Sequence, residues 1–292
     1  MRNTVFIHTN PKQRLGALVA RHALLRHSAA PDRFDVRILS TADFPALLRF
    51  EGRHYRREGA SEVWLNDDLQ SFTPLRFAVP ELMGYAGRAV LTDPDIFALG
   101  DINELFERDM HGAAILARQM PADSRRPLHW ASSVMLLDCA KLRHWHWEAD
   151  FEKLFQGERD YTEWMWLLGE PAGSVAPLET VWNDFDRLTP ETRLLHNTHR
   201  RTQPWKTGLP VDFTVHGTTS SARLGMWLRR LRGKGRGHYK RHPDPAQERF
   251  FFRMLGECVA AGSVPASMID DEIRLGHIRT DARTCIARAV ST

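Results

Sequence analysis

Two aspartates, Asp93 and Asp95, lie two residues apart just beyond the apolar run at residues 89–91. Pro94 stands between them and stiffens the turn that carries both carboxylates. Carboxylate oxygens are ligands that suit Mg²⁺ and Mn²⁺, and these ions keep coordination positions open for phosphate oxygens. An Asp-x-Asp turn is also common as a plain solvated turn. The pattern therefore raises the hypothesis of a metal site but does not establish it alone.

Polar residues also follow several other apolar runs of the chain. In open α/β sheets, ligands bind beyond the carboxyl ends of the strands, so these positions are the ones to inspect. They are His8, Thr9, Asn10, Arg118, Gln119, His196 and Asn197. These residues and the two aspartates are the candidate site residues.

The elements that would position these residues alternate between strands and helices. Residues 15–22 carry apolar positions at helical spacing, and residues 34–38 alternate between apolar and polar side chains, as a half-buried strand does. Short apolar runs predict further strands at residues 5–7, 89–91, 113–116 and 134–137. Strands separated by helical stretches predict an α/β fold with a mostly parallel sheet covered by helices.

The composition changes near residue 210. Residues 213–243 contain no Asp or Glu, whereas eight Lys and Arg residues fall there. We therefore divide the chain into an α/β domain at residues 1–212 and a basic, mainly helical C-terminal extension at residues 213–292. A last helix is well signalled, because Asp244 can cap it and Pro245 suits its first turn. Its apolar stripe consists of Phe251, Met254, Leu255, Cys258 and Val259.

The basic extension also carries an amphipathic pattern. One face of a short helix would collect Leu224, Trp227, Leu228 and Leu231, and the arginines lie largely off that face. Such a helix suits a membrane interface, where each basic residue near an anionic leaflet contributes on the order of 1 kcal/mol. We predict that residues 223–241 contact an anionic membrane surface. The alternative is that the apolar face packs on the first domain and the arginines are solvated.

Length and composition narrow the class of protein. The 292 residues are 42% hydrophobic and include 15 Phe and 9 Trp, which excludes disorder as the dominant state. No apolar run approaches the roughly 20 residues of a membrane span. Three cysteines at wide spacing fit neither a disulfide framework nor a zinc site, and we expect no secretory signal. The expected location is the cytoplasm, with a peripheral position on the inner face of the membrane.

Three sequence segments resemble the family 8 glycosyltransferases. The segment after the aspartates reads LGDINELF at residues 99–106, similar to the tail of that family's metal motif. WASSVMLL at residues 130–137 resembles a family strand, and LHNTHRRTQPW at residues 195–205 resembles its late histidine segment. The resemblance runs from about Thr4 to Trp205 and keeps the family order. It implies the GT-A fold, a Rossmann-like mixed sheet flanked by helices, with residues 1–212 as the catalytic domain.

The resemblance also implies roles for individual residues. Asp95 and His196 would bind the metal directly, and Asp93 would reach the ribose or the metal. The expected nucleotide and donor contacts are His8, Thr9, Asn10, Arg76, Ser132 and Gln203. Asp160 and Asn183 would lie at the transferred sugar. Two alternatives remain open from the residues themselves: Asp160 caps the helix that follows it, and Arg76 forms a surface ion pair.

Taken together, the pattern predicts a glycosyltransferase that depends on Mn²⁺ or Mg²⁺. It would move a sugar from a nucleotide diphosphate donor, a UDP-sugar by resemblance, to a surface saccharide or a lipid-linked acceptor, with retention of configuration. One alternative is a degenerate protein that binds nucleotide sugars with weak turnover. A nucleotidyltransferase would need a Gly-rich phosphate loop, which residues 10–14 lack. A nucleic-acid-binding module is not expected, because no recognised motif accompanies the basic segment.

Overall fold

The computed structural model describes residues 2–124, 126–214 and 237–291, in two compact units. The first unit is Met1–His196 and the second is Asn197–Thr292. The structural boundary therefore lies before residue 212, where the composition changes. The physical reason is that the segment after His196 bonds to the C-terminal part of the chain. Asn197 Nδ2 donates to Gln247 Oε1 at 2.6 Å, and Arg279 N donates to the Trp205 carbonyl at 2.8 Å.

A six-stranded sheet forms the centre of the first unit, in the order β2-β1-β5-β8-β7-β9. Its strands are β1 (Asn3–Thr9), β2 (Phe34–Ser40), β5 (Arg88–Thr92), β7 (Ile115–Met120), β8 (His129–Asp138) and β9 (Val175–Pro177). Strands β2, β1 and β5 are parallel, whereas β8 is antiparallel to both β5 and β7. Five of the six strands run in the same direction, as expected of a mostly parallel sheet, and β8 is reversed because the link from β7 to β8 is too short for a crossover. The mixed sheet flanked by helices is confirmed.

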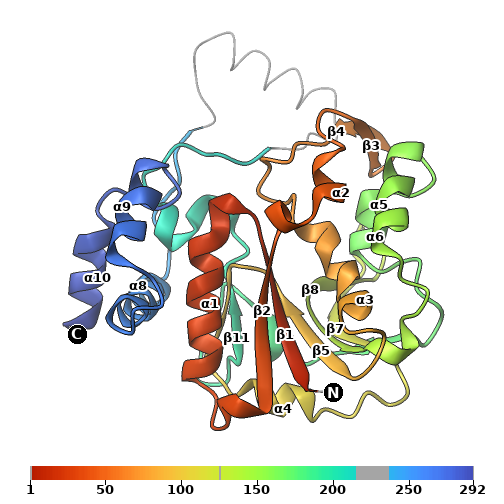
Figure 1. Cartoon of the computed structure of the whole chain (residues 1–292), viewed down its shortest axis with the longest axis horizontal. Helices are drawn as coiled ribbons and strands as arrows, with labels where there is room; N and C mark the ends of the chain where they lie inside the picture. The colour runs from red at the N-terminus through yellow and green to blue at the C-terminus, as the bar shows by residue number, and fades with distance from the viewer. Residues whose placement is uncertain (1, 125, 215–236, 292) are drawn as a thin grey trace. The chain divides into compact units, whose positions relative to one another are not determined.

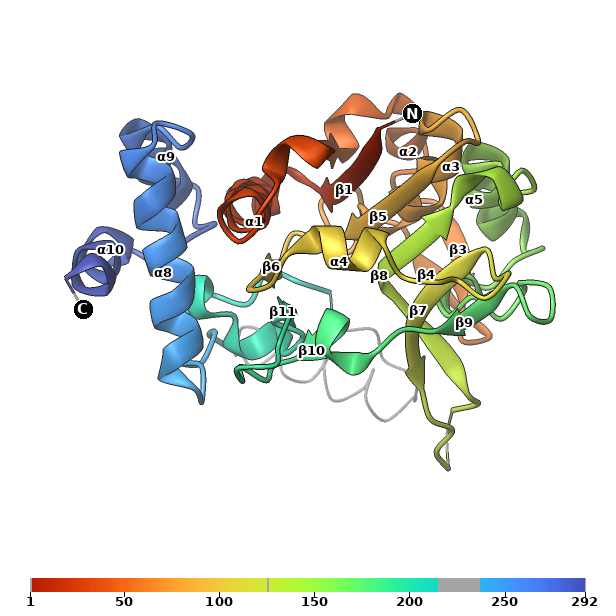
Figure 2. The same cartoon turned by 90° about the horizontal axis from the view of Figure 1, so that it is seen from below.

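Helices cover both faces of this sheet (Figures 1 and 2). On one face lie α1 (Arg14–Arg26) and α4 (Ile102–Phe106). On the other lie α2 (Pro45–Leu48), α3 (Val79–Leu82) and α5 (Trp147–Gln156). The core beneath this second group joins Phe6, Leu91 and Met135 of the strands to Phe151 of α5. Alternate strand residues thus face opposite helical layers, which explains why the strands read as continuous apolar runs.

A second, small sheet creates the geometry of the candidate site. It has the order β10-β11-β6, with β6 (Ile96–Ala98), β10 (Asp184–Phe185) and β11 (Leu194–His196). Strand β11 runs antiparallel to β6, and His196 is the partner of Ile96. Because Ile96 directly follows Asp95, this register places His196 beside the turn that carries the aspartates.

The Gly-Asp-Ile segment after β6 has a structural role. Asp101 caps α4 by accepting a hydrogen bond from Asn103 N at 2.9 Å. The same carboxylate accepts from Ser28 Oγ at 2.9 Å and from Ala29 N at 3.1 Å. Asp101 therefore ties α4 to the loop that follows α1, and this explains one of the motifs that carried the family resemblance.

A separate hairpin, β3 (His54–Arg57) and β4 (Ala60–Val63), packs near α5 and α6 (Tyr161–Met165). Its two-residue turn has positive φ at Glu58 (50°) and Gly59 (72°), as a tight hairpin turn requires. Tyr55 of β3 is buried against Trp64 and Tyr161 at ring-centroid distances of 5.7 Å each. The hairpin is thus anchored to the core by an aromatic cluster.

The second unit contains α8 (Pro245–Ala260), α9 (Ala266–Arg274) and α10 (Ala282–Val290). Asp244 caps α8 by accepting from Ala246 N at 2.8 Å, and Pro245 occupies the first turn, as predicted. The predicted interfacial helix at residues 224–231 lies outside the described residues. Within the part of the chain that the structure describes, no helix is long and apolar enough to cross a membrane.

We expect Gly16→Ala to destabilise the protein. A Cβ atom at Gly16 would lie 2.6 Å from the carbonyl oxygen of Pro94, so α1 and the aspartate turn would have to separate. The predicted loss in unfolding free energy is about 1–3 kcal/mol, measured by urea denaturation. Gly169→Ala is the matched control, because a Cβ there meets no atom of the described part of the chain within 4 Å. Equal stabilities of the two variants would contradict this close packing.

Candidate functional site

The ends of β5 and β11 bring together Asp93, Asp95 and His196. One donor atom from each residue lies within 4.8 Å of the donor atoms of the other two. His196 Nε2 is 3.6 Å from Asp95 Oδ1, and the exposed fractions of these two side chains are 10% and 16%. The three residues that the sequence placed at a metal site thus form one cluster, largely screened from solvent.

Arg76 holds Asp93 in this cluster. It lies in the 3₁₀ helix Thr73–Ala78, and its Nε donates to Asp93 Oδ1 at 3.1 Å while Nη2 donates to Asp93 Oδ2. Nη1 donates to Ser132 Oγ at 2.9 Å, and Ser132 Oγ donates to the Met165 carbonyl at 2.5 Å. Arg76 is 7% exposed, so the ion pair that the sequence left open exists, but it is buried.

The electrostatics of the cluster follow from its burial. Burial raises the pKa of Asp95 to about 8, and the neighbouring charge of Asp93 acts in the same direction. Burial also raises the pKa of Asp93, against the opposing effect of Arg76. Burial lowers the pKa of His196 to about 3, helped by Arg76 and Arg118. The imidazole is therefore neutral at pH 7, as a metal ligand must be.

Asn183 and Ser133 orient the imidazole of His196. Asn183 Nδ2 donates to Ser133 Oγ at 3.0 Å, so the amide oxygen of Asn183 faces His196 Nδ1 at 2.8 Å. Because this oxygen only accepts, Nδ1 carries the proton and Nε2 presents its lone pair towards Asp95. Asn183 is fully buried, so its side chain positions His196. The sugar contact expected for it from the sequence stays a prediction.

The donor set fits a divalent cation. Two carboxylates and one neutral imidazole suit ions such as Mn²⁺, and a cation would offset the cost of burying two acidic groups together. A hydrogen-bonded partner on the far nitrogen of the histidine is also typical of metal-binding imidazoles. The Asp93–Asp95–His196 cluster is therefore a possible metal centre.

The residues after β1 have different environments. The ring of His8 is fully buried between two backbone carbonyls, with Nδ1 3.2 Å from Thr92 O and Nε2 3.1 Å from Leu75 O. Thr9 Oγ1 donates to the Asn10 carbonyl at 3.1 Å. His8 thus joins β1, β5 and the segment that carries Arg76. The nucleotide contacts expected of His8 and Thr9 stay predictions.

Asn10 is buried but keeps an acceptor available. Its Nδ2 donates to the Asp68 carbonyl at 3.0 Å and to Ser71 Oγ at 3.2 Å, which fixes the orientation of the amide. Asn10 Oδ1 is buried and has no hydrogen-bond partner among the described residues. A buried acceptor of this kind is a suitable contact for a ligand N–H or O–H group.

Asp160 has the capping role that the sequence left open. Its carboxylate accepts from Thr162 N at 2.8 Å at the start of α6, and also from Gly59 N of the hairpin at 2.9 Å. A catalytic role for Asp160 remains a prediction. Gln203 is buried in the second unit, at the start of the 3₁₀ helix Pro204–Lys206, and its predicted contact with the diphosphate also remains a prediction.

The family resemblance implies no role for Arg118, although this residue follows an apolar run of the sequence. Its Nη1 donates to the Asn183 carbonyl at 2.5 Å, and its guanidinium lies 4.0 Å from the centre of the Phe185 ring. The Phe185 ring meets the His196 ring edge-on at 5.3 Å. Arg118 and Phe185 therefore belong to the surroundings of the cluster. Phe185 comes from β10, a two-residue strand with no recognisable pattern in the sequence.

No protein-family model and no curated protein sequence matches the chain. Several solved structures that are similar to it are glycosyltransferases. They include the glycosyltransferase GlyE of Streptococcus pneumoniae TIGR4, with 16% identity and a TM-score of 0.49 over 89% of this chain. Mouse xyloside xylosyltransferase 1 has 14% identity and a TM-score of 0.42, covering 68% of this chain and 98% of that protein.

The galactosyltransferase LgtC, solved with donor and acceptor sugar analogues, is a third similar structure. It has 14% identity and a TM-score of 0.43, covering 80% of this chain and 96% of LgtC. The chain spans a smaller share, 64%, of the length of GlyE.

We expect Asn183→Ala to weaken Mn²⁺ binding about tenfold to a hundredfold, because His196 would lose the partner that fixes its tautomer and orientation. Titration calorimetry of the full chain with Mn²⁺ measures the effect, and a thermal melt checks that the variant is folded. Asn103→Ala is the control, since Asn103 is also buried but bonds Ser28 near α4. Unchanged Mn²⁺ affinity in folded Asn183→Ala would refute this positioning role.

His8 should make the protein sensitive to acid. Burial lowers its pKa from 6.5 to about 3, so between these pH values the unfolded chain binds a proton that the folded protein does not. The unfolding free energy therefore has its full value above pH 6.5 and decreases as the pH falls below it. Between pH 7 and pH 5, wild type should lose about 2 kcal/mol more unfolding free energy than His8→Asn. The exposed His111→Asn variant should behave as wild type. Equal losses in all three proteins would contradict the assignment.

Proposed function

We propose that the protein is a metal-dependent glycosyltransferase that moves a sugar from a nucleotide diphosphate donor to a saccharide or lipid-linked acceptor. The observation that carries this proposal is the clustering of Asp93, Asp95 and His196 at the carboxyl end of β5. In α/β sheets this is the edge at which ligands bind. The sequence resemblance to family 8 glycosyltransferases supports the same assignment.

The chemistry of the reaction explains the donor set. Breaking the bond between sugar and diphosphate leaves negative charge on the leaving group, and a bound divalent cation such as Mn²⁺ supplies electrostatic stabilisation of that charge. Asp95 and His196 would hold the cation, and Asp93 would bind either the cation or the ribose. Arg76 fixes the carboxylate of Asp93 with two hydrogen bonds. Each charged side chain of the cluster thus has a role in binding the cation or the donor.

Residues around the cluster supply further contacts for the donor. Arg118 carries a positive charge near His196 and is a suitable partner for a diphosphate oxygen. The buried Oδ1 of Asn10 is suited to accept a hydrogen bond from the nucleoside. By family resemblance, we propose uridine as the base. Ser132 is already bonded to Arg76 and Met165, so we propose that it orients Arg76.

One observation also favours a weaker activity. The carboxylate of Asp160, the candidate group near the transferred sugar, accepts backbone hydrogen bonds from both α6 and the hairpin. A protein that binds nucleotide sugars with slow turnover is therefore the second candidate. The rate at which the protein hydrolyses UDP-sugars with Mn²⁺ and no acceptor distinguishes the two, because the second candidate predicts binding without turnover.

The metal dependence of nucleotide binding tests the proposal. We expect UDP to bind at least tenfold more tightly with Mn²⁺ than with EDTA, because a cation held by Asp95 and His196 would supply positive charge to the diphosphate. Asp95→Ala should abolish this difference without unfolding the protein. Isothermal titration calorimetry of wild type and variant measures both affinities.

Asp109→Ala serves as the matched control, since its side chain is 76% exposed and lies outside the cluster. This variant should keep the full Mn²⁺ effect. The same titration with GDP tests the base, and UDP should bind more tightly. Equal UDP affinity with Mn²⁺ and with EDTA would refute the metal-dependent mechanism, and tighter binding of GDP would refute the uridine preference alone.

A further inference from the structure

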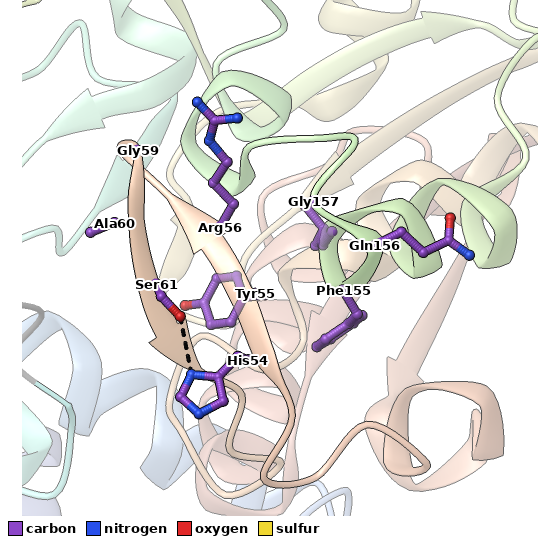
Figure 3. Close-up of a pocket in the computed structure, with 10 residues that line it drawn as sticks. His54, Tyr55, Arg56, Gly59, Ala60, Ser61, Phe155, Gln156 and Gly157 are labelled. Atoms are coloured by element: carbon purple, nitrogen blue, oxygen red, sulfur yellow. Dashed lines mark hydrogen bonds between the residues drawn. The ribbon is translucent and has the colours of Figure 1, made fainter.

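A cavity lies beside the β3–β4 hairpin, outside the Asp93–Asp95–His196 cluster. Its volume is about 480 Å³, which is within the range of small-molecule sites. The hairpin forms one wall, and the end of α5 forms the other (Figure 3). The lining residues are His54, Tyr55, Arg56, Gly59, Ala60, Ser61, Leu154, Phe155, Gln156 and Gly157.

The lining combines an aromatic ring with hydrogen-bonding side chains. Phe155 supplies the ring, and the buried ring of Tyr55 lies beside it at a centroid distance of 6.2 Å. His54 Nδ1 lies 3.1 Å from Ser61 Oγ, so these two side chains face each other across the hairpin (Figure 3). Aromatic surface beside a few polar groups suits a sugar, whose ring has apolar C–H faces and a rim of hydroxyls.

The backbone of β3 adds further polar groups. Among the described residues, β3 pairs only with β4, so its other edge is free for a ligand. Arg57 pairs with Ala60 across the two-residue turn, and Tyr55 pairs with Glu62. In such a hairpin the intervening residues, His54 and Arg56, direct their N–H and C=O groups away from β4. These groups are available to bind hydroxyls.

The charge of the cavity is positive. Of the described residues that line it, Arg56 carries a positive charge, and none has a carboxylate. The guanidinium of Arg53, the residue before β3, lies 5.6 Å from the centre of the Phe155 ring. The carboxylate of Asp160 is 3.9 Å from Arg56 Nε, but it also accepts two backbone N–H groups. The side chain of Arg56 is 58% exposed, so its charge remains available to an anion.

The cavity is connected to the metal cluster through a short helix. Gly59, in the cavity wall, donates its N–H to Asp160 at 2.9 Å, and Asp160 caps α6. At the other end of α6, the Met165 carbonyl accepts from Ser132, which is bonded to Arg76. A ligand in the cavity would therefore lie on the same side of the Asp93–Asp95–His196 cluster as Asp160.

We propose that this cavity binds an anionic sugar, a saccharide unit that carries a carboxylate or a phosphate group, and that this unit belongs to the acceptor. The acceptor part of the proposal rests on the proposed function, whereas the binding part does not. Arg56 would bind the anionic group, the free edge of β3 and Ser61 would bind hydroxyls, and the ring of Phe155 would pack against the sugar.

Ligand-observed NMR titrations of the full chain test the binding. The probes are glucuronic acid, glucose 6-phosphate, glucose and inorganic phosphate, each without nucleotide or metal. Both anionic sugars should bind more tightly than glucose and more tightly than inorganic phosphate. Arg56→Gln should weaken binding of the anionic sugars about fivefold, with a smaller effect at high salt, and should leave glucose unchanged. Arg49→Gln is the matched control, because Arg49 is exposed and near α5 but does not line the cavity.

Each deviation from this pattern overturns the proposal. Equal affinity for glucose and glucuronic acid, or an unchanged affinity in Arg56→Gln, would exclude recognition of the charge by Arg56. Inorganic phosphate binding as tightly as glucose 6-phosphate would indicate an anion site without sugar recognition. Because the assay contains neither UDP nor Mn²⁺, its result is independent of the titrations that test the proposed function.

Discussion

The burial of two carboxylates at the end of one strand is the constraint on which the site depends. Asp93 and Asp95 lie where solvent contributes little, and burial alone raises the pKa of both groups. One guanidinium, that of Arg76, pairs with Asp93. Beside Asp95 stands a histidine that burial keeps neutral. A divalent cation would stabilise this cluster, because it would supply the positive charge that a neutral imidazole does not.

The surrounding fold supports this cluster from several directions. The absence of a side chain at Gly16 lets α1 approach the aspartate turn, and the pairing of β11 with β6 sets His196 beside it. Asn183 then selects the nitrogen that His196 presents. These contacts come from segments far apart in the chain, so the site forms only when both sheets are complete. The hairpin and α6 extend the same network towards the cavity that we assign to an anionic sugar.

The sequence predicted the parts of this structure that are local. The apolar runs before Asp93 and Asp95, and the cap and proline at the start of α8, are signals within a few residues, and the structure has the expected elements there. The cluster of Asp93, Asp95 and His196 was predicted through a family resemblance, since nothing local places His196 near the aspartates.

Other features depended on pairings between distant segments. The antiparallel direction of β8 follows from the short link after β7. Apolar runs predict where strands lie but not the direction in which each strand runs. The hydrogen bond from His196 to Asn183 depends on β10 and β11, strands of two and three residues. Strands this short carry no periodicity, so Asn183 could not be identified as the partner of the histidine.

A crystal structure of the protein grown with Mn²⁺ and UDP, with anomalous data collected at the manganese edge, tests the central claim most directly. We predict one anomalous peak in contact with Asp95 and His196 Nε2, with the diphosphate of UDP bound to the same ion. A structure with UDP bound elsewhere, or with Asp95 and His196 bonded to each other and no anomalous peak between them, would contradict it.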